Sequence, residues 1–176
     1  VKTRGTWGET QLALLLENFL QADQYAANVR PNPQSEKIVE FAVKLPGQGD
    51  DKPLWLPLDS KFPREDYERL VNASEQADGE GAEQAGKALA ASIESSARDI
   101  RDKYIVPPHT TDFAILFLPT EGLYAEVLRR PGLADKVQRE YRVLIAGPTT
   151  LAALLNALQQ GFRTLAIQKR SADIWK

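Results

Sequence analysis

Two short, nearly continuous apolar segments constrain the fold of this chain more than any other feature. They are Asp112–Leu118 (DFAILFL) and Tyr141–Ala146 (YRVLIA). Each has the length of a β-strand, and neither alternates regularly between apolar and polar residues. A strand of this kind is buried on both faces, so helices must cover both sides of its sheet. Asp112–Leu118 therefore predicts a central strand, and Tyr141–Ala146 predicts another buried strand.

Helical patterns surround these strands. Thr6-Trp7-Gly8-Glu9 fits a capping box, and residues 6–20 continue as an amphipathic helix. Further helices are expected at 64–72, 82–104, 121–129, 133–140, 149–160 and 162–175, with a loop at 75–81 and an extended segment at 25–30. Strands interleaved with helices indicate the α/β class, with helices packed on a sheet.

A β-hairpin is predicted near the start of the chain and makes the sheet mixed. Ile38–Leu45 alternates between apolar and polar residues, and Leu54–Phe62 returns after a turn at Gly47–Asp51. Proline cannot donate a ladder hydrogen bond, so Pro53 and Pro57 predict that the returning strand lies partly at an edge or is irregular at its start.

This hairpin is expected to oppose two carboxylates. If its turn centres near Gly49, Glu40 faces Asp59 across the strands, with Cβ atoms roughly 5 Å apart. Lys61 lies two residues further along and shares that face. Like charges opposite one another repel, so a raised pKa, the lysine or a bound cation must offset the repulsion. The same residues on an exposed face would form an ordinary cluster of surface ion pairs.

A divalent cation would turn the carboxylates into a reactive site. The chain has no cysteine and one histidine, so a metal must be held by carboxylates, which favours Mg²⁺ or Mn²⁺. Such an ion polarises a phosphodiester oxygen and activates a bound water, while Lys61 would orient that water or stabilise the transition state. Glu9, at the head of the apolar stripe of the first helix, is a third candidate ligand. Helix capping explains a glutamate at that position equally well.

Positive charge gathers in the last part of the chain. Residues 126–176 carry nine Lys and Arg against four Asp and Glu, whereas the whole chain has a net charge of −2. An acidic isoelectric point of 5.6 argues against tight, non-specific DNA binding. The candidate contacts to a DNA backbone are Arg129, Arg130, Arg163, Lys169 and Arg170, with Thr149 at a helix start whose N–H groups suit a phosphate. Solvated surface cations and ordinary threonine capping are the alternatives.

Several sequence blocks, taken in order, resemble the DNA recombination protein RmuC family. They are 5–9 (GTWGE), 39–47 (VEFAVKLPG), 55–63 (WLPLDSKFP), 103–108 (KYIVPP), 111–125 (TDFAILFLPTEGLYA) and 143–155 (VLIAGPTTLAALL). The resemblance covers nearly the whole chain. It implies a restriction-endonuclease-like (PD-(D/E)XK) core, in which a helix packs on a mixed sheet that bears an acidic pair and a lysine.

The resemblance also assigns roles to residues. Glu40 stands at the first acidic position, Asp59-Ser60-Lys61 supplies the (D/E)-x-K element, and Glu9 matches a glutamate on the first helix. Many members have Pro-Asp where this chain has Val39-Glu40, and the longer glutamate changes where a metal is held. The implied function is Mg²⁺-dependent cleavage of DNA in recombination. A non-catalytic DNA-binding or scaffold domain of the same fold, or an assembly domain that uses the helix at 82–104, is the alternative.

Residues 1–176 are expected to form a single domain that is a fragment of a longer protein, since the chain contains no methionine. The resemblance implies a cytoplasmic domain whose parent protein carries an N-terminal membrane anchor and a coiled coil. DNA is the expected partner, homo-oligomers would form through that coiled coil, and no small-molecule cofactor is expected.

Overall fold

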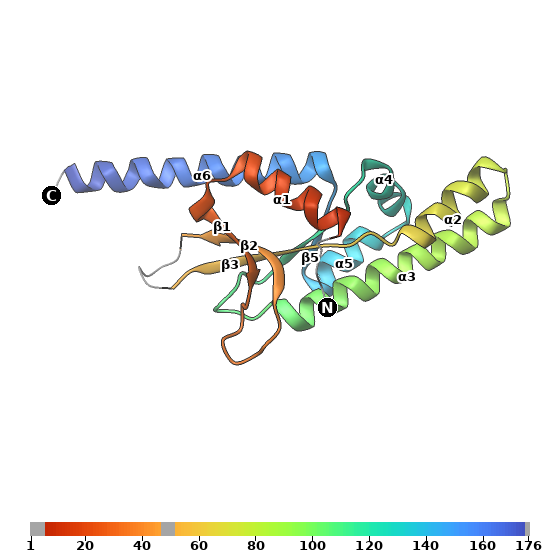
Figure 1. The fold of residues 1–176 in the computed structure, drawn as a ribbon, viewed down its shortest axis with the longest axis horizontal. Coiled ribbons are helices and arrows are strands. Elements are labelled where there is room, and N and C mark those ends of the chain that lie inside the picture. The colour runs from red at the N-terminus through yellow and green to blue at the C-terminus, as the bar shows by residue number, and fades with distance from the viewer. Residues whose placement is uncertain (1–5, 47–51, 175–176) are drawn as a thin grey trace.

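A mixed β-sheet forms the centre of the molecule (Figure 1). The structure is a computed structural model that describes residues 6–46 and 52–174. The five strands lie in the order β1-β2-β3-β4-β5. Their bounds are β1 Tyr25–Val29, β2 Val39–Leu45, β3 Leu54–Ser60, β4 Ala114–Phe117 and β5 Val143–Ala146. The pairs β1–β2 and β2–β3 are antiparallel, whereas β3–β4 and β4–β5 are parallel, which confirms the α/β class and the mixed sheet.

Helices cover both faces of the sheet. They are α1 Trp7–Phe19, α2 Arg64–Glu75, α3 Gly79–Tyr104, α4 Glu121–Arg129, α5 Leu133–Tyr141 and α6 Pro148–Ile174, with a 3₁₀ turn at Ala22–Gln24. Helices α1 and α6 pack on one face, and α3, α4 and α5 pack on the other, with α2 lying along α3 (Figure 1). The site described below lies where α1 meets the sheet.

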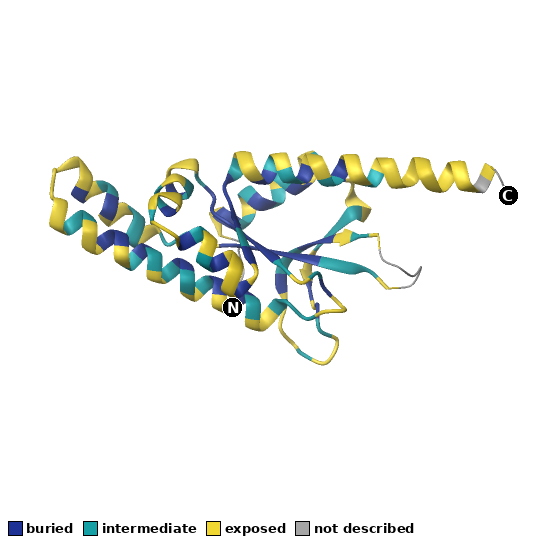
Figure 2. Ribbon diagram, turned by 180° about the vertical axis from the view of Figure 1, so that it is seen from behind, coloured by how far each residue is buried: buried dark blue, intermediate teal, exposed yellow. Residues whose placement is uncertain are grey.

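Strand β4 shows why the apolar runs require two helical layers. Ala114 and Leu116 point into the core beneath α3, whereas Ile115 and Phe117 point into the core beneath α1. All four side chains are fully buried. In Figure 2 the strands at the centre of the molecule are accordingly coloured mostly as buried. The prediction of a central strand covered on both faces is therefore confirmed for β4.

The hairpin has the predicted register. Phe41 pairs with Leu58 and Leu45 with Leu54, and the same register places Glu40 opposite Asp59. The predicted turn at 47–51 lies outside the described residues.

Of the two alternatives that the prolines predict, the edge position of β3 is wrong, because this strand pairs with β2 on one side and β4 on the other. The irregular start is confirmed, since Trp55 forms an isolated bridge to Thr110 and the β3–β4 ladder begins only at Leu58. The backbone N–H and C=O of Trp55 both point toward the segment that precedes β4. The Trp55 N–H donates to the His109 carbonyl, and the Trp55 carbonyl accepts from the Thr111 N–H. Pro57 faces the same way, and its missing N–H falls before the β3–β4 ladder begins at Leu58. Proline is therefore tolerated in a central strand. The strand also ends at Ser60, before the predicted Phe62.

Two predictions about helices need correction. The loop expected at 75–81 is shorter, since α3 begins at Gly79, where the Asp78 carboxylate accepts a hydrogen bond from the Gly81 N–H at 3.0 Å. The two helices expected at 149–160 and 162–175 are one helix, α6, which runs through Gly161. A glycine inside a helix costs only about 1 kcal/mol relative to alanine, so it does not have to end one.

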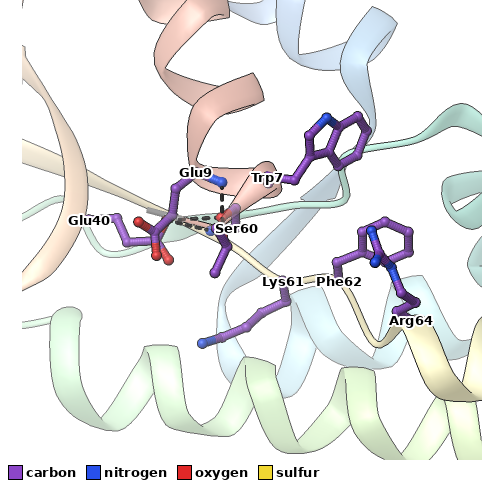
Figure 3. A pocket seen from close by; sticks show the side chains of 9 residues that line it. Trp7, Glu9, Glu40, Ser60, Lys61, Phe62 and Arg64 are labelled. Atoms are coloured by element: carbon purple, nitrogen blue, oxygen red, sulfur yellow. Dashed lines mark hydrogen bonds between the residues drawn. The ribbon is translucent and has the colours of Figure 1, made fainter. Parts of the chain in front are cut away.

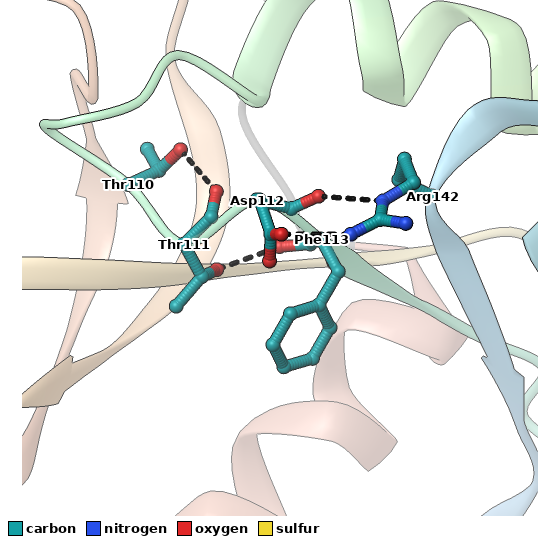
Figure 4. Close-up of polar contacts among 5 residues, drawn as sticks. All are labelled: Thr110, Thr111, Asp112, Phe113 and Arg142. Atoms are coloured by element: carbon teal, nitrogen blue, oxygen red, sulfur yellow. Dashed lines mark hydrogen bonds and ion pairs between the residues drawn. The ribbon is translucent and has the colours of Figure 1, made fainter.

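An ion pair links the amino ends of the parallel strands β4 and β5 (Figure 4). The Arg142 guanidinium, between α5 and β5, donates to the Asp112 carboxylate at 2.7 Å and to the Asp112 carbonyl at 3.4 Å. Next to it, the Thr111 hydroxyl donates to the Phe113 carbonyl at 2.7 Å. These contacts fix the end of the sheet opposite to Asp59, which lies at the carboxyl end of β3.

Candidate functional site

A cleft of about 490 Å³ opens at the carboxyl end of β3. The start of α1, the start of β2 and the β3–α2 connection surround it (Figure 3). Its lining residues are Thr6, Trp7, Gly8, Glu9, Glu40, Ser60, Lys61, Phe62 and Arg64. The cleft thus combines acidic, basic and aromatic side chains within a small volume.

Glu40 and Asp59 form the acidic pair of this site. Asp59 is 3% exposed, on the face of β3 opposite to the core residues Leu56 and Leu58. Glu40 is half-buried, and its Oε2 accepts hydrogen bonds from the Ser60 hydroxyl at 2.9 Å and the Ser60 N–H at 3.4 Å. The Glu40 side chain also shares a hydrogen bond with Asp59. Two carboxyl groups are therefore held in direct contact.

This contact changes the acidity of Glu40. Burial, followed by the negative charge of Asp59 and the hydrogen bond to it, raises the pKa of Glu40 from 4.5 to about 8. The Ser60 hydrogen bond opposes the rise, and the charge of Glu9 adds to it. In the absence of a bound metal ion, the Glu40–Asp59 pair therefore holds one proton at neutral pH.

Lys61 is the cation closest to the pair. Its Nζ lies 3.2 Å from Asp59 Oδ2, with the lysine side chain 45% exposed and the aspartate side chain 5% exposed. The Lys61 N–H donates to the Phe117 carbonyl at 3.0 Å, so the backbone still follows the sheet one residue past β3. Glu40, Asp59 and Lys61, which were predicted to share a face, lie together.

Helix α1 brings Glu9 to the same cleft. The Thr6 hydroxyl caps the helix by accepting from the Glu9 N–H at 3.2 Å, as the sequence predicts. Leu12 and Leu16 are fully buried against the sheet, which orients the helix so that Glu9 lines the cleft. Glu9 is close enough to Glu40 to raise its pKa, so capping and a place in the acidic site are compatible.

The acidic site offers only oxygen ligands. Among residues 6–46 and 52–174, no group of three or more His, Cys, Asp and Glu side chains is arranged to hold a metal ion. The Glu40–Asp59 pair is thus a two-carboxylate site with Glu9 beside it. Tyr104, the last residue of α3, lies near the pair, and burial followed by the charges of Asp59 and Glu40 raises its pKa to about 12.

Comparison with known proteins identifies the family. The RmuC family model matches residues 1–176, the full length of the chain. The chain belongs to the RmuC family. Its curated relatives carry the name DNA recombination protein RmuC homolog, and one from Xylella fastidiosa is 62% identical over 99% of this chain. Others, from Neisseria meningitidis and Chlamydia trachomatis, are 28% and 26% identical.

The relatives are longer than this chain. The matched region makes up 39% of the Xylella protein, 38% of the Chlamydia protein and 31% of the Neisseria protein. No solved structure matches. Of the helices described in this RmuC chain, none has both the length and the apolar character that crossing a membrane requires.

The cations that were candidates for DNA contact lie away from the cleft of this RmuC chain. Arg129 pairs with Glu126 at 2.8 Å, and Arg130 lies 3.8 Å from Glu83. Arg163, Lys169 and Arg170 lie on exposed turns of α6. The N–H of Thr149 donates to the Glu121 carboxylate at 2.6 Å, so a glutamate already caps the helix start proposed for a phosphate. Within residues 6–46 and 52–174, the cations that line the cleft are Lys61 and Arg64.

Sequence reasoning missed Ser60, Phe62 and Arg64. Ser60 sits between Asp59 and Lys61, and its hydroxyl orients Glu40. Phe62 lies in the connection to α2, and Arg64 is the first residue of α2. Their position immediately after the Asp-x-Lys element was the available signal, because residues that leave a strand end together line the same edge of the sheet.

Proposed function

We propose that this chain is a DNA-processing domain of a DNA recombination protein, and that it hydrolyses phosphodiester bonds with the help of Mg²⁺ or Mn²⁺. The observation that carries the proposal is the contact of Glu40 with the buried Asp59, with Lys61 beside them. Glu40 and Lys61 line an open cleft at the carboxyl end of β3. Carboxyl ends of parallel strands are where open α/β sheets bind their ligands. The relatives' name supplies the link to DNA recombination.

The side chains present fit a hard divalent ion. Mg²⁺ binds in proteins through one or two carboxylates and keeps several water ligands, so Glu40 and Asp59 are a sufficient protein contribution. Glu9 would join them at the edge of the site. The bound ion would supply charge stabilisation for a phosphodiester and a water molecule of lowered pKa.

The chain's own residues supply orientation and charge. The Ser60 hydroxyl holds Glu40, and Lys61 holds Asp59, so neither acidic side chain rotates freely. The Lys61 ammonium, being partly exposed, reaches the cleft and is placed to orient the attacking water or to donate to the phosphate in the transition state. The packing of α1 on the sheet beside this acid pair supports a PD-(D/E)XK-like nuclease core.

A non-catalytic DNA-binding or scaffold domain is the second candidate. It is favoured by the Lys61–Asp59 ion pair, which offsets the charge of Asp59 without any metal. In that case the cleft residues would stabilise the fold and bind DNA without cutting it. Metal binding separates the two candidates.

The deciding experiment is a calorimetric titration of Mg²⁺ and of Mn²⁺ into wild type and Asp59→Asn, with DNA cleavage followed on the same samples. Glu17→Gln is the matched control for Glu9→Gln, because both glutamates lie on α1 and Glu17 is exposed away from the cleft lining. We expect Asp59→Asn to abolish metal binding and cleavage, Glu9→Gln to weaken both, and Glu17→Gln to change neither. Metal binding that survives Asp59→Asn would refute the site.

A further inference from the structure

One side of the cleft carries aromatic and cationic groups instead of acids. Figure 3 shows Trp7, Phe62 and Arg64 grouped apart from Glu9 and Glu40. The Trp7 and Phe62 ring centroids lie 5.9 Å apart, with the planes tilted by 47°. The Arg64 guanidinium lies over the Phe62 ring, 5.1 Å from its centroid. These three side chains, called here the aromatic shelf, come from the start of α1, the β3–α2 connection and the start of α2.

The fold leaves much of the aromatic shelf exposed to solvent. Trp7 is 47% exposed although it lies at the first position of a helix whose Leu12 and Leu16 are fully buried. The Arg64 side chain is 62% exposed, and it approaches Glu68 at 4.0 Å, the limit of an ion pair. An exposed indole beside a guanidinium offers an apolar face and a positive charge together, which is the combination that binds a nucleobase and its phosphate.

The electrostatics of the cleft favour one form of nucleic acid. Duplex DNA is bound chiefly through many phosphate contacts. Among the residues that the structure describes, the cations that line the cleft are Lys61 and Arg64, and they are opposed by Glu9 and Glu40. Bases inside a duplex are also stacked on both faces, so they have no free face for an indole. An unpaired base has such a face, and aromatic stacking gives affinity that needs little positive charge.

We infer that the aromatic shelf binds an unpaired nucleotide of single-stranded DNA, with the base stacked on Trp7 and the adjoining phosphate near Arg64. The shelf and Glu40 line one cleft, so a strand held on the shelf passes Glu40, the carboxyl group that contacts Asp59. This inference rests on the proposed function for the choice of DNA as ligand. It adds that the bond to be cut lies in, or next to, a single-stranded segment.

The test follows the fluorescence of Trp7 and does not require that DNA be cleaved. A Trp55→Phe, Trp175→Phe protein keeps Trp7 as its only tryptophan. It is titrated in EDTA with short oligothymidylate, with an abasic strand of equal length, and with a blunt duplex. We expect oligothymidylate to quench the Trp7 fluorescence, and the abasic strand and the duplex to bind roughly five- to 100-fold more weakly, the range expected from losing one stacked base. A Trp7→Phe, Trp175→Phe protein, which reports from Trp55, should show no quenching.

Two substitutions complete the test. Trp7→Ala should weaken oligothymidylate binding by a similar factor and leave abasic-strand binding unchanged, whereas Trp7→Phe should keep most of the affinity. Arg64→Gln should lower the salt dependence of binding, and Arg69→Gln on the same helix should not. Melting temperatures show whether each variant is folded.

The outcomes separate this inference from the nuclease proposal. Abasic and normal strands that bind equally well, DNA that binds without quenching Trp7, or no detectable single-strand binding would each overturn the inference. Quenching and base-dependent binding without any cleavage in Mg²⁺ or Mn²⁺ would support the aromatic shelf and count against hydrolysis.

Discussion

At the scale of single residues, the site depends on how the protein offsets the repulsion between two buried carboxyl groups. Glu40 contacts Asp59 while half-buried, and Asp59 is almost fully buried. A proton on Glu40 and the ammonium of Lys61 offset the repulsion in the metal-free protein. Each of these two compensations makes a separate prediction.

Glu40→Gln should stabilise the metal-free protein most at high pH. The pKa of Glu40 is about 8 in the folded state, compared with an ordinary value of 4.5, so the folded state binds the proton more tightly. The stability that this proton contributes is fully present below about pH 4.5 and is lost as the pH rises through about 8. Glutamine can accept from Ser60 and donate to Asp59 at every pH. Urea unfolding in EDTA should show the variant gaining on wild type from about pH 5 to about pH 9, while Glu17→Gln shows no such trend; a pH-independent difference would contradict this.

Lys61→Met should destabilise the fold by roughly 1–3 kcal/mol at neutral pH, because it leaves the buried Asp59 carboxylate without its cation. Lys44→Met is the control, since Lys44 is exposed on the neighbouring strand β2, and we expect it to stay within about 0.5 kcal/mol of wild type. Adding Asp59→Asn to Lys61→Met removes the stranded charge and should recover most of the loss. Denaturant unfolding measures all three, and a double variant no more stable than Lys61→Met would exclude this explanation.

The acidic pair could be predicted from sequence because strand alternation and hairpin register are local properties. Glu40 faces Asp59 for the same reason that Phe41 faces Leu58. The roles of Ser60, Phe62 and Arg64 could not be predicted, because they depend on how the chain leaves β3 and on the placement of α1 above it. That placement is a tertiary contact between segments far apart in the sequence.

At the scale of elements, the position of α1 depends on a close approach at Gly8. A Cβ atom on Gly8 would lie 3.0 Å from Pro119 Cγ and 3.3 Å from Ser60 Oγ. Pro119 follows β4, so this contact joins the start of α1 to the carboxyl ends of β3 and β4. Glu9 is the next residue, and its distance from Glu40 is therefore set by the small size of Gly8.

Gly8→Ala should push the start of α1 away from the sheet, at a cost of roughly 1–3 kcal/mol in unfolding free energy. Gly79→Ala is the matched control at the start of another helix, since a Cβ there meets nothing within 4 Å, and we expect it to be within about 0.5 kcal/mol of wild type. Any metal affinity that depends on Glu9 should fall with Gly8→Ala as well. Equal stability of the two variants would show that α1 can shift at no cost.

Element boundaries were less predictable than element types. The pattern predicted the start of the strand at Leu54 correctly and its end two residues too late. Of the alternatives inferred from Pro53 and Pro57, the edge position was wrong, because the sequence does not show which ladder hydrogen bonds a proline would have to make. The split of α6 at Gly161 was wrong for a related reason. A local breaker is a small penalty, and neighbouring helical residues, including Leu158 and Phe162 packed on the core, outweigh it.

At the scale of the whole molecule, the sheet unites two cores while part of α6 lies outside both. Strand β4 contributes to the core on each face, which couples α1 and α6 to α3, α4 and α5. The second half of α6 extends beyond the sheet (Figures 1 and 2). Residues 163–172 are all exposed, and Leu165 and Ile167 are 49% and 66% exposed. The sequence pattern gave no sign of this extension, because it predicts a helix at 162–175 whether or not that helix packs on the core.

Removing residues 165–176 should therefore leave the free energy of unfolding within about 0.5 kcal/mol of the full chain, although helical circular dichroism falls. The exposed turns contribute little packing, and an isolated helix of this length is marginal in water. Phe162→Ala, made in the shortened chain, is the comparison: its half-buried ring packs on the core beneath α1, so its loss should cost roughly 1–2 kcal/mol. Urea unfolding followed by tryptophan fluorescence measures both. A truncation as costly as Phe162→Ala would mean that the extended half of α6 packs against the rest of the chain in solution.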